Sequence, residues 1–206
     1  MFSANEANRQ YFRDAYRTGE HGWAVHEPSP YAVDFLHQLS SVTPNGAMLD
    51  VGCGEGRHSI AAARTGFRVV GIDYEPLALR RARSFAKAHG IKGITFRVAD
   101  VLDMSFGDAC FDVVLDYGCL HHQRKTDWPR YKAGILRVLK SRGYYVLSVF
   151  SPRFRFSEAP PGTGISHTAL TGGASQEKTS ATCSPPISQS SGWLRRRATA
   201  AASGML

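Results

Sequence analysis

The chain has 206 residues, of which 43% are hydrophobic and 20% charged, with a formal net charge of +8. These values are typical of one globular domain, and no apolar run is long enough to cross a bilayer, so we expect no membrane partner and a cytoplasmic location. The basic residues are scattered rather than interleaved with aromatic ones, which argues against a nucleic-acid partner.

The first 45 residues predict two helices and a loop between them. Residues 5–18 place aromatic side chains on one side and arginines on the other, which indicates an amphipathic helix. A serine–proline pair, the usual N-cap and first helical position, opens a second helix over residues 30–41. We expect residues 1–45 to form a lid over a cofactor or substrate, with Trp23 and His26 in the loop. Trp23 is equally well explained as a buried core side chain.

Strands and helices alternate over the next part of the chain. Apolar runs predict strands at 47–51, 68–72, 94–98, 111–116 and 144–150. Helical patterns predict helices at 57–65, 76–89 and 128–140. Continuous apolar strands separated by helices are typical of a parallel sheet that is covered on both faces. The sequence therefore predicts an α/β core over residues 46–155.

The segment 48–56 carries the strongest functional signal, because an apolar run ends there in an acid and leads into alternating glycines. A Cβ atom at Gly52, Gly54 or Gly56 would block positive φ or hold a ligand away from the backbone. Asp73 ends the next apolar run, at the position where a ribose hydroxyl pair is held in nucleotide-binding folds. Together these features predict a nucleoside-containing cofactor.

The pattern D-x-G-x-G-x-G from Asp50 to Gly56, with an acid ending the next strand, resembles the class I S-adenosylmethionine-dependent methyltransferases. It looks in particular like the small-molecule branch with the type 11 methyltransferase domain. Dinucleotide-binding proteins place the third glycine one residue later, which argues against a nicotinamide cofactor. The resemblance covers residues 11–150. Its further matching segments are 98–101, 111–116 and 120–122.

The resemblance implies a role for each predicted cofactor-binding residue. Asp73 would accept hydrogen bonds from both ribose hydroxyls, and Tyr74 would pack on the adenine. Asp100 would accept the adenine amino hydrogen, and the backbone N–H of Val101 would serve a ring nitrogen. The full set is Asp50, Gly52, Cys53, Gly54, Gly56, Asp73, Tyr74, Asp100, Val101, Asp116 and Tyr117.

Two parts of this set face the methionine end of the donor by the same resemblance. A carbonyl or side chain near Asp116 and Tyr117 would meet the methionine ammonium, and Asp50 would orient that end through water. Structural alternatives stay open for several of these residues. Asp50, Asp73 and Asp100 are each also explained as acids that cap a turn or helix, and Tyr74 as an exposed loop aromatic.

His121 and His122 follow the fourth predicted strand, at the edge where a methyl acceptor would enter, and are the candidates for a general base. The alternative is that one histidine points into the core while the other lines the pocket. The four cysteines show no CxxC pairing and no helical pairing with histidines, so we expect no metal site.

A complete fold of the family that the chain resembles has seven strands in the order 3-2-1-4-5-7-6, whereas only five are predicted here. We therefore expect a Rossmann-like, doubly wound, mostly parallel sheet of order 3-2-1-4-5 with helices on both faces and the last two strands missing. Residues 156–206 have a low-complexity composition that predicts disorder. Our hypothesis is that a frame change or truncation altered them. The fifth strand would then be an open edge, through which a homodimer could form.

The sequence thus predicts S-adenosylmethionine-dependent methyl transfer to a small-molecule acceptor by in-line displacement. The alternative is a non-catalytic protein that binds S-adenosylmethionine but lacks a complete acceptor site, and an NAD-dependent oxidoreductase is a more remote one. The acceptor atom is not identified by any motif.

Overall fold

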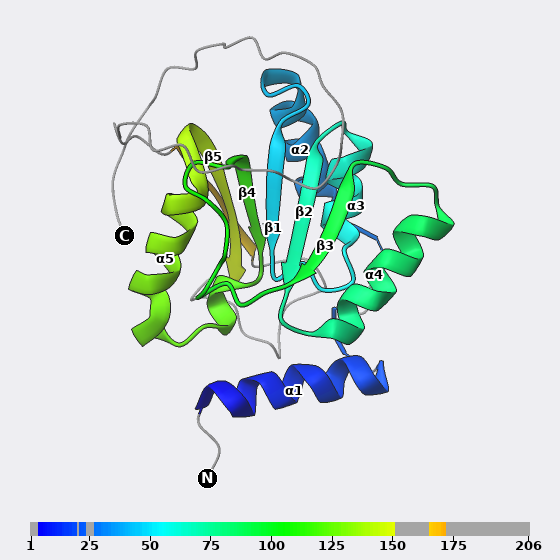
Figure 1. Ribbon diagram of the computed structural model, residues 1–206, viewed down its shortest axis with the longest axis vertical. Coiled ribbons are helices and arrows are strands. Elements are labelled where there is room, and N and C mark those ends of the chain that lie inside the picture. The colour runs from blue at the N-terminus through cyan, green and yellow to red at the C-terminus, as the bar shows by residue number, and fades with distance from the viewer. Residues whose placement is uncertain (1–3, 20, 24–26, 151–164, 172–206) are drawn as a thin grey trace.

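The computed structural model describes residues 4–19, 21–23, 27–150 and 165–171, and His26 lies outside these ranges. Within them the chain forms one sheet of order β3-β2-β1-β4-β5-β6 (Figure 1). The strands are β1 (Ala47–Val51), β2 (Arg68–Asp73), β3 (Ile94–Val98), β4 (Phe111–Tyr117), β5 (Leu139–Phe150) and β6 (Ile165–Thr171). The helices are α1 (Ala4–Thr18), α2 (Pro30–Val42), α3 (Arg57–Arg64), α4 (Pro76–Ala88) and α5 (Trp128–Val138), with 3₁₀ turns η1 (Leu120–His122) and η2 (Lys125–Asp127).

The centre of the sheet is β1, which pairs in parallel with β2 on one side and β4 on the other. All five of its residues are buried, because helices cover both faces of the sheet. Side chains alternate between the faces along a strand, so Met48 packs with α2 and α3 whereas Leu49 packs with α5. The predicted parallel order 3-2-1-4-5 is confirmed.

The two faces carry different helices. Leu36 of α2 and Ala62 of α3 belong to one apolar cluster, and Ile60 of α3 continues into a second cluster with Leu79 of α4. On the opposite face, α5 inserts Tyr131 and Ile135, each 1% exposed, into the largest cluster. The strand ends between these layers are held rigidly, which is what a binding site at the sheet edge requires.

The boundary between α5 and β5 differs from the prediction. We expected a helix to residue 140 and a strand from 144, but α5 ends at Val138 and β5 begins at Leu139. Leu139 already pairs with Phe111 of β4, and an irregularity then separates this pair from the regular register that resumes at Tyr144. Tertiary pairing with β4 thus overrides the local helical pattern.

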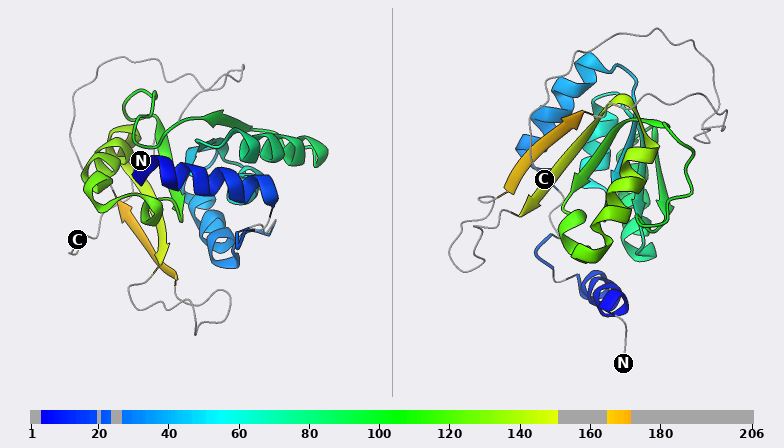
Figure 2. Two further views of the ribbon diagram at one scale, coloured as in Figure 1. Left: turned by 90° about the horizontal axis from the view of Figure 1, so that it is seen from below. Right: turned by 90° about the vertical axis from the view of Figure 1, so that its left-hand side faces the viewer.

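The expectation that no strand follows β5 is wrong. Strand β6 pairs antiparallel with β5 from Tyr144↔Thr171 to Phe150↔Ile165, so β5 is paired on both sides from Tyr144 to Ser148 (Figure 2). The pairing satisfies backbone groups that an open edge would expose. The predicted homodimer loses the β5 edge on which it was based. The rest of the predicted disordered segment, residues 156–164 and 172–206, lies outside the described residues.

Helix α1 lies apart from both helical layers, across the end of the sheet at which the parallel strands finish (Figures 1 and 2). The loops that follow β1, β2 and β4 emerge at that end, so α1 faces the position of the predicted cofactor site. We expected residues 1–45 to provide a lid, and α1 is the element that lies in that place.

Candidate functional site

The parallel register brings the predicted site residues together. Val51 at the end of β1 pairs with Ile72 of β2 and with Asp116 of β4. Because the three strands point the same way, the glycine loop (residues 52–56), the turn at Asp73 and the turn after Asp116 meet at one edge. This is the edge at which ligands bind in open α/β sheets.

The glycine loop has the conformation that the sequence predicts. Gly52, Gly54 and Gly56 have φ values of 64°, 55° and 82°, in the region that favours glycine. The neighbouring space, however, belongs to protein side chains rather than to a ligand. A Cβ on Gly54 would lie 2.7 Å from the Tyr16 hydroxyl of α1, and a Cβ on Gly52 would lie 2.8 Å from the Cys119 sulfur.

Cys53 contacts the glycine loop through its thiol, which lies 3.8 Å from the Gly54 carbonyl oxygen, and contacts β2 through its backbone. Its N–H donates to the Ile72 carbonyl at 2.9 Å, which fastens the loop to β2. Its thiol lies against β2, since a Cβ on Gly71 would come within 2.9 Å of the sulfur. Burial raises the pKa of this thiol well above its ordinary value, so it stays protonated and is no nucleophile at neutral pH.

Asp73 joins the glycine loop to the start of α4. One carboxylate oxygen accepts the Gly54 N–H and the other accepts the Glu75 N–H, each at 2.9 Å. Burial raises the pKa of Asp73 to about 6, against the lowering effect of these backbone donors. The two predicted features, the glycine loop and the acid after the second strand, are therefore one hydrogen-bonded unit.

Asp50 lies beneath this unit and is 3% exposed. The Ser59 hydroxyl of α3 donates to its carboxylate, so Asp50 attaches the helix that follows the loop. Burial raises the pKa of Asp50 to about 7, and the nearby charges of Asp116 and Asp73 act in the same direction. This hydrogen bond comes from a side chain of α3 and is not the cap of the following turn that we gave as the alternative role of Asp50.

Asp116 differs from the prediction most clearly. Its carboxylate is 0% exposed and accepts hydrogen bonds from four protein donors. The backbone N–H groups of Cys119 and Leu120 bind one oxygen at 2.7 and 3.2 Å, and the hydroxyls of Tyr131 and Tyr145 bind the other at 2.7 and 2.9 Å. The side chain that we expected as a possible partner of a ligand ammonium is therefore an internal junction between β4, η1, α5 and β5. Only the backbone near it is left for a ligand.

Tyr117 forms part of a stacked group beside the glycine loop. Its ring centroid lies 4.1 Å from that of His58, and the Arg57 guanidinium lies 6.0 Å from the same ring. Burial lowers the pKa of His58 to about 3, so the imidazole is neutral and accepts the Ser29 N–H at 3.2 Å. Ser29 is the predicted N-cap of α2, but its side chain makes no capping hydrogen bond. Sequence reasoning missed His58.

The third loop brings Asp100 and Val101 to the same end of the sheet. Asp100 accepts the Leu102 N–H at 2.9 Å, a local turn bond of the kind foreseen as its structural alternative. Its other oxygen forms an ion pair with Arg9 of α1. The Arg9 guanidinium carbon also lies 5.3 Å from the centre of the Tyr74 ring. Val101 is buried in the core with 7% of its surface exposed.

His121 and His122 lie next to each other on η1. Their Nε2 atoms are 3.1 Å apart, so one ring donates to the other. Burial lowers the pKa of His121 to about 4, with His122 adding to the effect, and burial also lowers the pKa of His122. Both rings are neutral at pH 7, which is the form that can accept a proton. The Phe12 ring of α1 meets His122 edge-on, with centroids 4.8 Å apart.

Helix α1 contacts the loops after β1, β2, β3 and β4. Tyr16 reaches Gly54, Arg9 reaches both Tyr74 and Asp100, and the Asn8 amide donates to the His122 carbonyl at 3.0 Å. Trp23 packs on Phe12 with a centroid distance of 5.1 Å, and so lies with α1 over the same end of the sheet. The amphipathic pattern predicted this helix, but its polar side chains that reach the site were not identified from the sequence.

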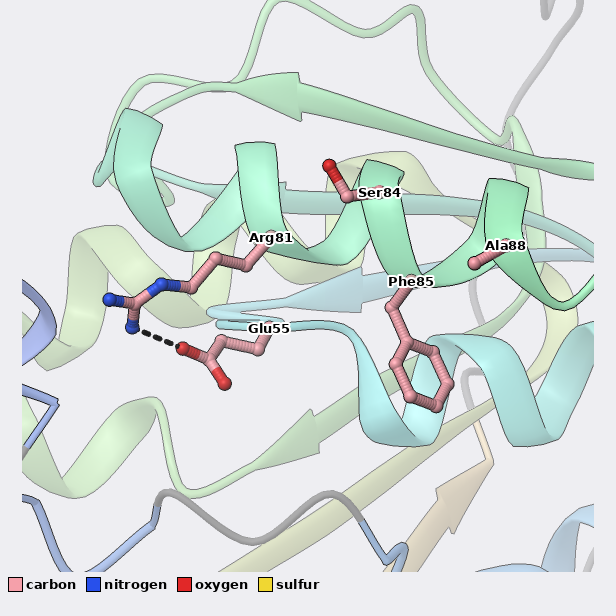
Figure 3. Close-up of a pocket in the computed structure, with 5 residues that line it drawn as sticks. All are labelled: Glu55, Arg81, Ser84, Phe85 and Ala88. Atoms are coloured by element: carbon pink, nitrogen blue, oxygen red, sulfur yellow. Dashed lines mark hydrogen bonds and ion pairs between the residues drawn. The ribbon is translucent and has the colours of Figure 1, made fainter.

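A surface hollow of about 370 Å³ lies outside α4 and reaches the glycine loop only at Glu55 (Figure 3). It is lined by Glu55, Arg81, Ser84, Phe85 and Ala88. An ion pair between Arg81 and Glu55, with N···O 2.8 Å, spans one part of it. The hollow contains none of the predicted site residues and gathers no set of reactive groups, so we do not assign it to the site.

Two negative findings concern only the described residues. Within them, no group of three or more histidine, cysteine, aspartate or glutamate side chains is arranged to hold a metal ion. No helix among the same residues is long and apolar enough to pass through a membrane.

The residues at the sheet edge fit an adenosyl group. Tyr74 and Asp100 together hold the guanidinium of Arg9, a planar group that carries N–H donors. The amino-bearing ring of adenine offers the same two features, a flat face and an N–H donor. The Tyr74 hydroxyl is buried and has no hydrogen-bond partner among the described residues, so a polar ligand atom there would satisfy it.

Several known proteins are similar to this chain in sequence or in fold. The chain is similar to 2-heptyl-1-hydroxyquinolin-4(1H)-one methyltransferase of Mycobacteroides abscessus, with 28% identity over 62% of this chain and 55% of that protein. It is also 26% identical to EEF1A lysine methyltransferase 2 of Danio rerio, over 79% of this chain and 77% of the relative. The chain thus spans little more than half the length of the first of these relatives.

Among solved structures, it resembles 1,6-didemethyltoxoflavin-N1-methyltransferase of Burkholderia thailandensis, which holds 1,6-didemethyltoxoflavin and S-adenosylhomocysteine. The TM-score is 0.61 and the identity 27%, over 81% of this chain and 73% of the other. The family model described as "Methyltransferase domain" matches residues 43–191, farther toward the C-terminus than the predicted extent of 11–150. With the site geometry and this match in agreement, the chain belongs to the S-adenosylmethionine-dependent methyltransferases of that domain family.

Proposed function

We propose that the protein transfers a methyl group from S-adenosylmethionine to a small-molecule acceptor. The observation that carries the proposal is the hydrogen-bonded unit of the glycine loop and Asp73, which faces Tyr74 and Asp100 at the sheet edge. Asp73 would hold the ribose, and Tyr74 and Asp100 would hold the adenine. Tyr117 and the backbone beside Asp116 would meet the methionine portion.

The donor supplies an already activated methyl group on its sulfonium sulfur when it is bound. The protein then contributes alignment and exclusion of water, which can account for about 7–11 kcal/mol of a barrier in favourable cases. Helix α1 would supply much of this cover through Phe12, Tyr16 and Trp23. His121 or His122 would accept a proton from those acceptors that must lose one, since both rings are neutral at pH 7, although burial lowers both pKa values and so makes each ring a weaker base.

A flat, apolar acceptor suits the aromatic residues of α1 and η1 at this end of the sheet. Phe12 and Trp23 pack together and His122 meets Phe12 edge-on, so the acceptor would lie among ring faces and edges. Two of the similar proteins are named for planar ring compounds, a hydroxyquinolinone and a toxoflavin precursor. Both points favour an aromatic or heteroaromatic metabolite.

A second candidate is methylation of a protein side chain. The observation in its favour is the similarity to the lysine methyltransferase from Danio rerio, which extends over more of both chains than does the similarity to the hydroxyquinolinone enzyme. A peptide would need an open path to the same edge, and α1 lies across that path. We therefore rank a small molecule first.

Calorimetry with S-adenosylhomocysteine and with NAD tests the cofactor assignment. We expect a micromolar dissociation constant for the former and no measurable binding of the latter. Transfer of labelled methyl groups to a panel of hydroxylated and aminated heteroaromatic compounds, with a lysine-rich protein extract in parallel, then tests the acceptor. Label in the protein fraction alone would favour the second candidate. Tight binding of S-adenosylhomocysteine, without methyl transfer to the heteroaromatic compounds or to the protein extract, would support a non-catalytic binding protein.

A cytoplasmic location and the oligomeric state are predictions that these experiments do not address. Size-exclusion chromatography with light scattering would measure the latter directly.

A further inference from the structure

Arg9 of α1 holds the two side chains that the proposed donor site assigns to adenine. Its guanidinium forms an ion pair with Asp100, and its carbon lies 5.3 Å from the centroid of the Tyr74 ring. Asp100 is the acceptor assigned to the adenine amino group, and Tyr74 is the surface assigned to the adenine face. One basic side chain therefore makes both contacts at once.

Adenine packed on the Tyr74 face that Arg9 covers cannot make these contacts together with the guanidinium. Stacked rings have centroids about 4.5 Å or more apart, and a guanidinium 5.3 Å from the Tyr74 centroid leaves no space for a ring between the two. The Asp100 oxygen that pairs with Arg9 would be the one offered to the amino group, because the other oxygen accepts the Leu102 N–H. A donor that enters the site must displace Arg9.

The displacement needs only the Arg9 side chain to move. The side chains of Arg9 and Asp100 are 44% and 32% exposed, and ion pairs of such exposure contribute little net stability. Helix α1 keeps its other contacts, namely the Asn8 bond to the His122 carbonyl, the Phe12 contact with His122 and the Tyr16 contact at Gly54. The cover can therefore stay in place while the arginine turns outward.

We propose that Arg9 is a built-in competitor of adenine, which closes the adenine subsite of the donor-free protein and lowers its affinity for the donor. This inference rests on the proposed donor site. It distinguishes Arg9 from a residue that stabilises bound donor, because the two roles predict opposite effects of its removal. When the donor binds, the displaced Arg9 side chain would change the polar surface that α1 presents to solvent.

Calorimetry with S-adenosylhomocysteine tests the proposal in the wild type and in Arg9→Ala, Arg9→Lys and Arg17→Ala. We expect Arg9→Ala to bind about three- to tenfold more tightly, because the ligand no longer breaks the ion pair and the cation–π contact. Lysine keeps a charge for Asp100 but lacks the planar group, so Arg9→Lys should lie between. Arg17, 75% exposed and paired with Asp14 on the same helix, is the matched control and should leave binding unchanged.

Salt and heat supply two further readouts. Screening of the Arg9–Asp100 pair should bring the wild-type affinity toward that of Arg9→Ala as ionic strength rises, whereas the affinity of the variant should change little. Without ligand, Arg9→Ala should melt slightly below the wild type, and saturating S-adenosylhomocysteine should remove this difference.

The outcomes separate this inference from the proposed function. Wild type that binds S-adenosylhomocysteine while Arg9→Ala binds it equally or more weakly overturns the inference alone, and weaker binding would make Arg9 a clamp on bound adenine. Failure of the folded wild type and all variants to bind overturns the proposed function and this inference with it. Binding by Arg9→Ala but not by the wild type supports the inference in its strongest form.

Discussion

At the scale of single residues, Asp73 has two tasks that a substitution should reveal separately. Its two oxygens accept the N–H groups of Gly54 and Glu75, and an amide can accept with only one oxygen. We expect Asp73→Asn to lower the free energy of unfolding by about 1–3 kcal/mol, because one buried N–H loses its partner. It should also weaken binding of S-adenosylhomocysteine at least tenfold. Urea unfolding and calorimetry measure the two effects.

The control for Asp73 is Asp34→Asn on the exposed side of α2, which should change neither quantity. An unchanged affinity in Asp73→Asn would remove this carboxylate from the ribose site, even if the protein were less stable.

The Asp116 junction should matter for stability. Tyr131→Phe and Tyr145→Phe each remove one hydroxyl donor from a buried carboxylate, at an expected cost of about 1.5–3 kcal/mol. Both tyrosines bind the same oxygen, so their contributions are coupled. The loss of unfolding free energy in the double variant should therefore differ from the sum of the two single losses by at least about 0.5 kcal/mol. Tyr144→Phe, the half-buried neighbour on β5, should cost far less. Equal losses from Tyr144→Phe and Tyr145→Phe in urea unfolding would contradict this account.

At the scale of elements, the pairing of β6 with β5 predicts the pattern of amide protection. Strand β5 lies between β4 and β6, whereas β3 ends the other side of the sheet. We expect amides of β5 from Tyr144 to Phe150 to exchange with deuterium as slowly as those of β1, and those of β3 to exchange faster. Exchange of β5 at the rate of β3 would mean that β6 does not form a lasting strand.

The same elements show what the sequence could and could not predict. Strand β1 was predictable because all of its residues are buried and apolar apart from Asp50. Strand β6 was not, because its seven residues lie in a sequence rich in serine, threonine and glycine and carry a weak local pattern, and their stabilisation comes from pairing with β5. The end of α5 was misplaced for a related reason, since Leu139 pairs with Phe111 across the sheet.

The candidate site also contains residues that the sequence predicted and residues that it did not. Asp50 and Asp73 were found because each lies at or near the end of a buried strand, and strand ends of a parallel sheet meet. Arg9 and Tyr16 were not, because periodicity predicts which side of α1 is apolar but not where the helix docks. The hydrogen-bonded surroundings of the Asp116 side chain were not predicted because its partners, Tyr131 and Tyr145, come from elements whose packing no local pattern encodes.

At the scale of the whole molecule, buried acids make stability depend on pH. Burial raises the pKa of Asp50 to about 7, above its ordinary value of 3.8, so the folded state holds a proton that the unfolded state has lost between these values. This stabilisation is complete below pH 3.8 and is lost as the pH rises through 7. His58, whose pKa is lowered to about 3, acts in the opposite sense and loses its contribution as the pH falls below 6.5.

Asp50→Asn isolates the acid from these opposing effects. Between pH 5 and pH 8 the wild type should lose about 2–3 kcal/mol of unfolding free energy relative to the variant, because only the wild type must ionise a buried carboxyl group. Histidine titration is common to both proteins and cancels in the difference. Urea unfolding at several pH values gives the two curves, and parallel curves would show that Asp50 is already ionised at pH 5.

The junction at Asp116 also limits how this protein could be re-engineered. The N–H groups of Cys119 and Leu120 tie the segment that carries both histidines to Asp116 of β4, and the hydroxyls of Tyr131 and Tyr145 fix the other oxygen of the same carboxylate, so that segment cannot be replaced independently of the sheet. Libraries aimed at new methyl acceptors should therefore randomise the exposed residues from Arg124 onward in η2 and keep the carboxylate and its two phenols unchanged. Diversity placed one turn earlier would unfold clones before it altered their chemistry.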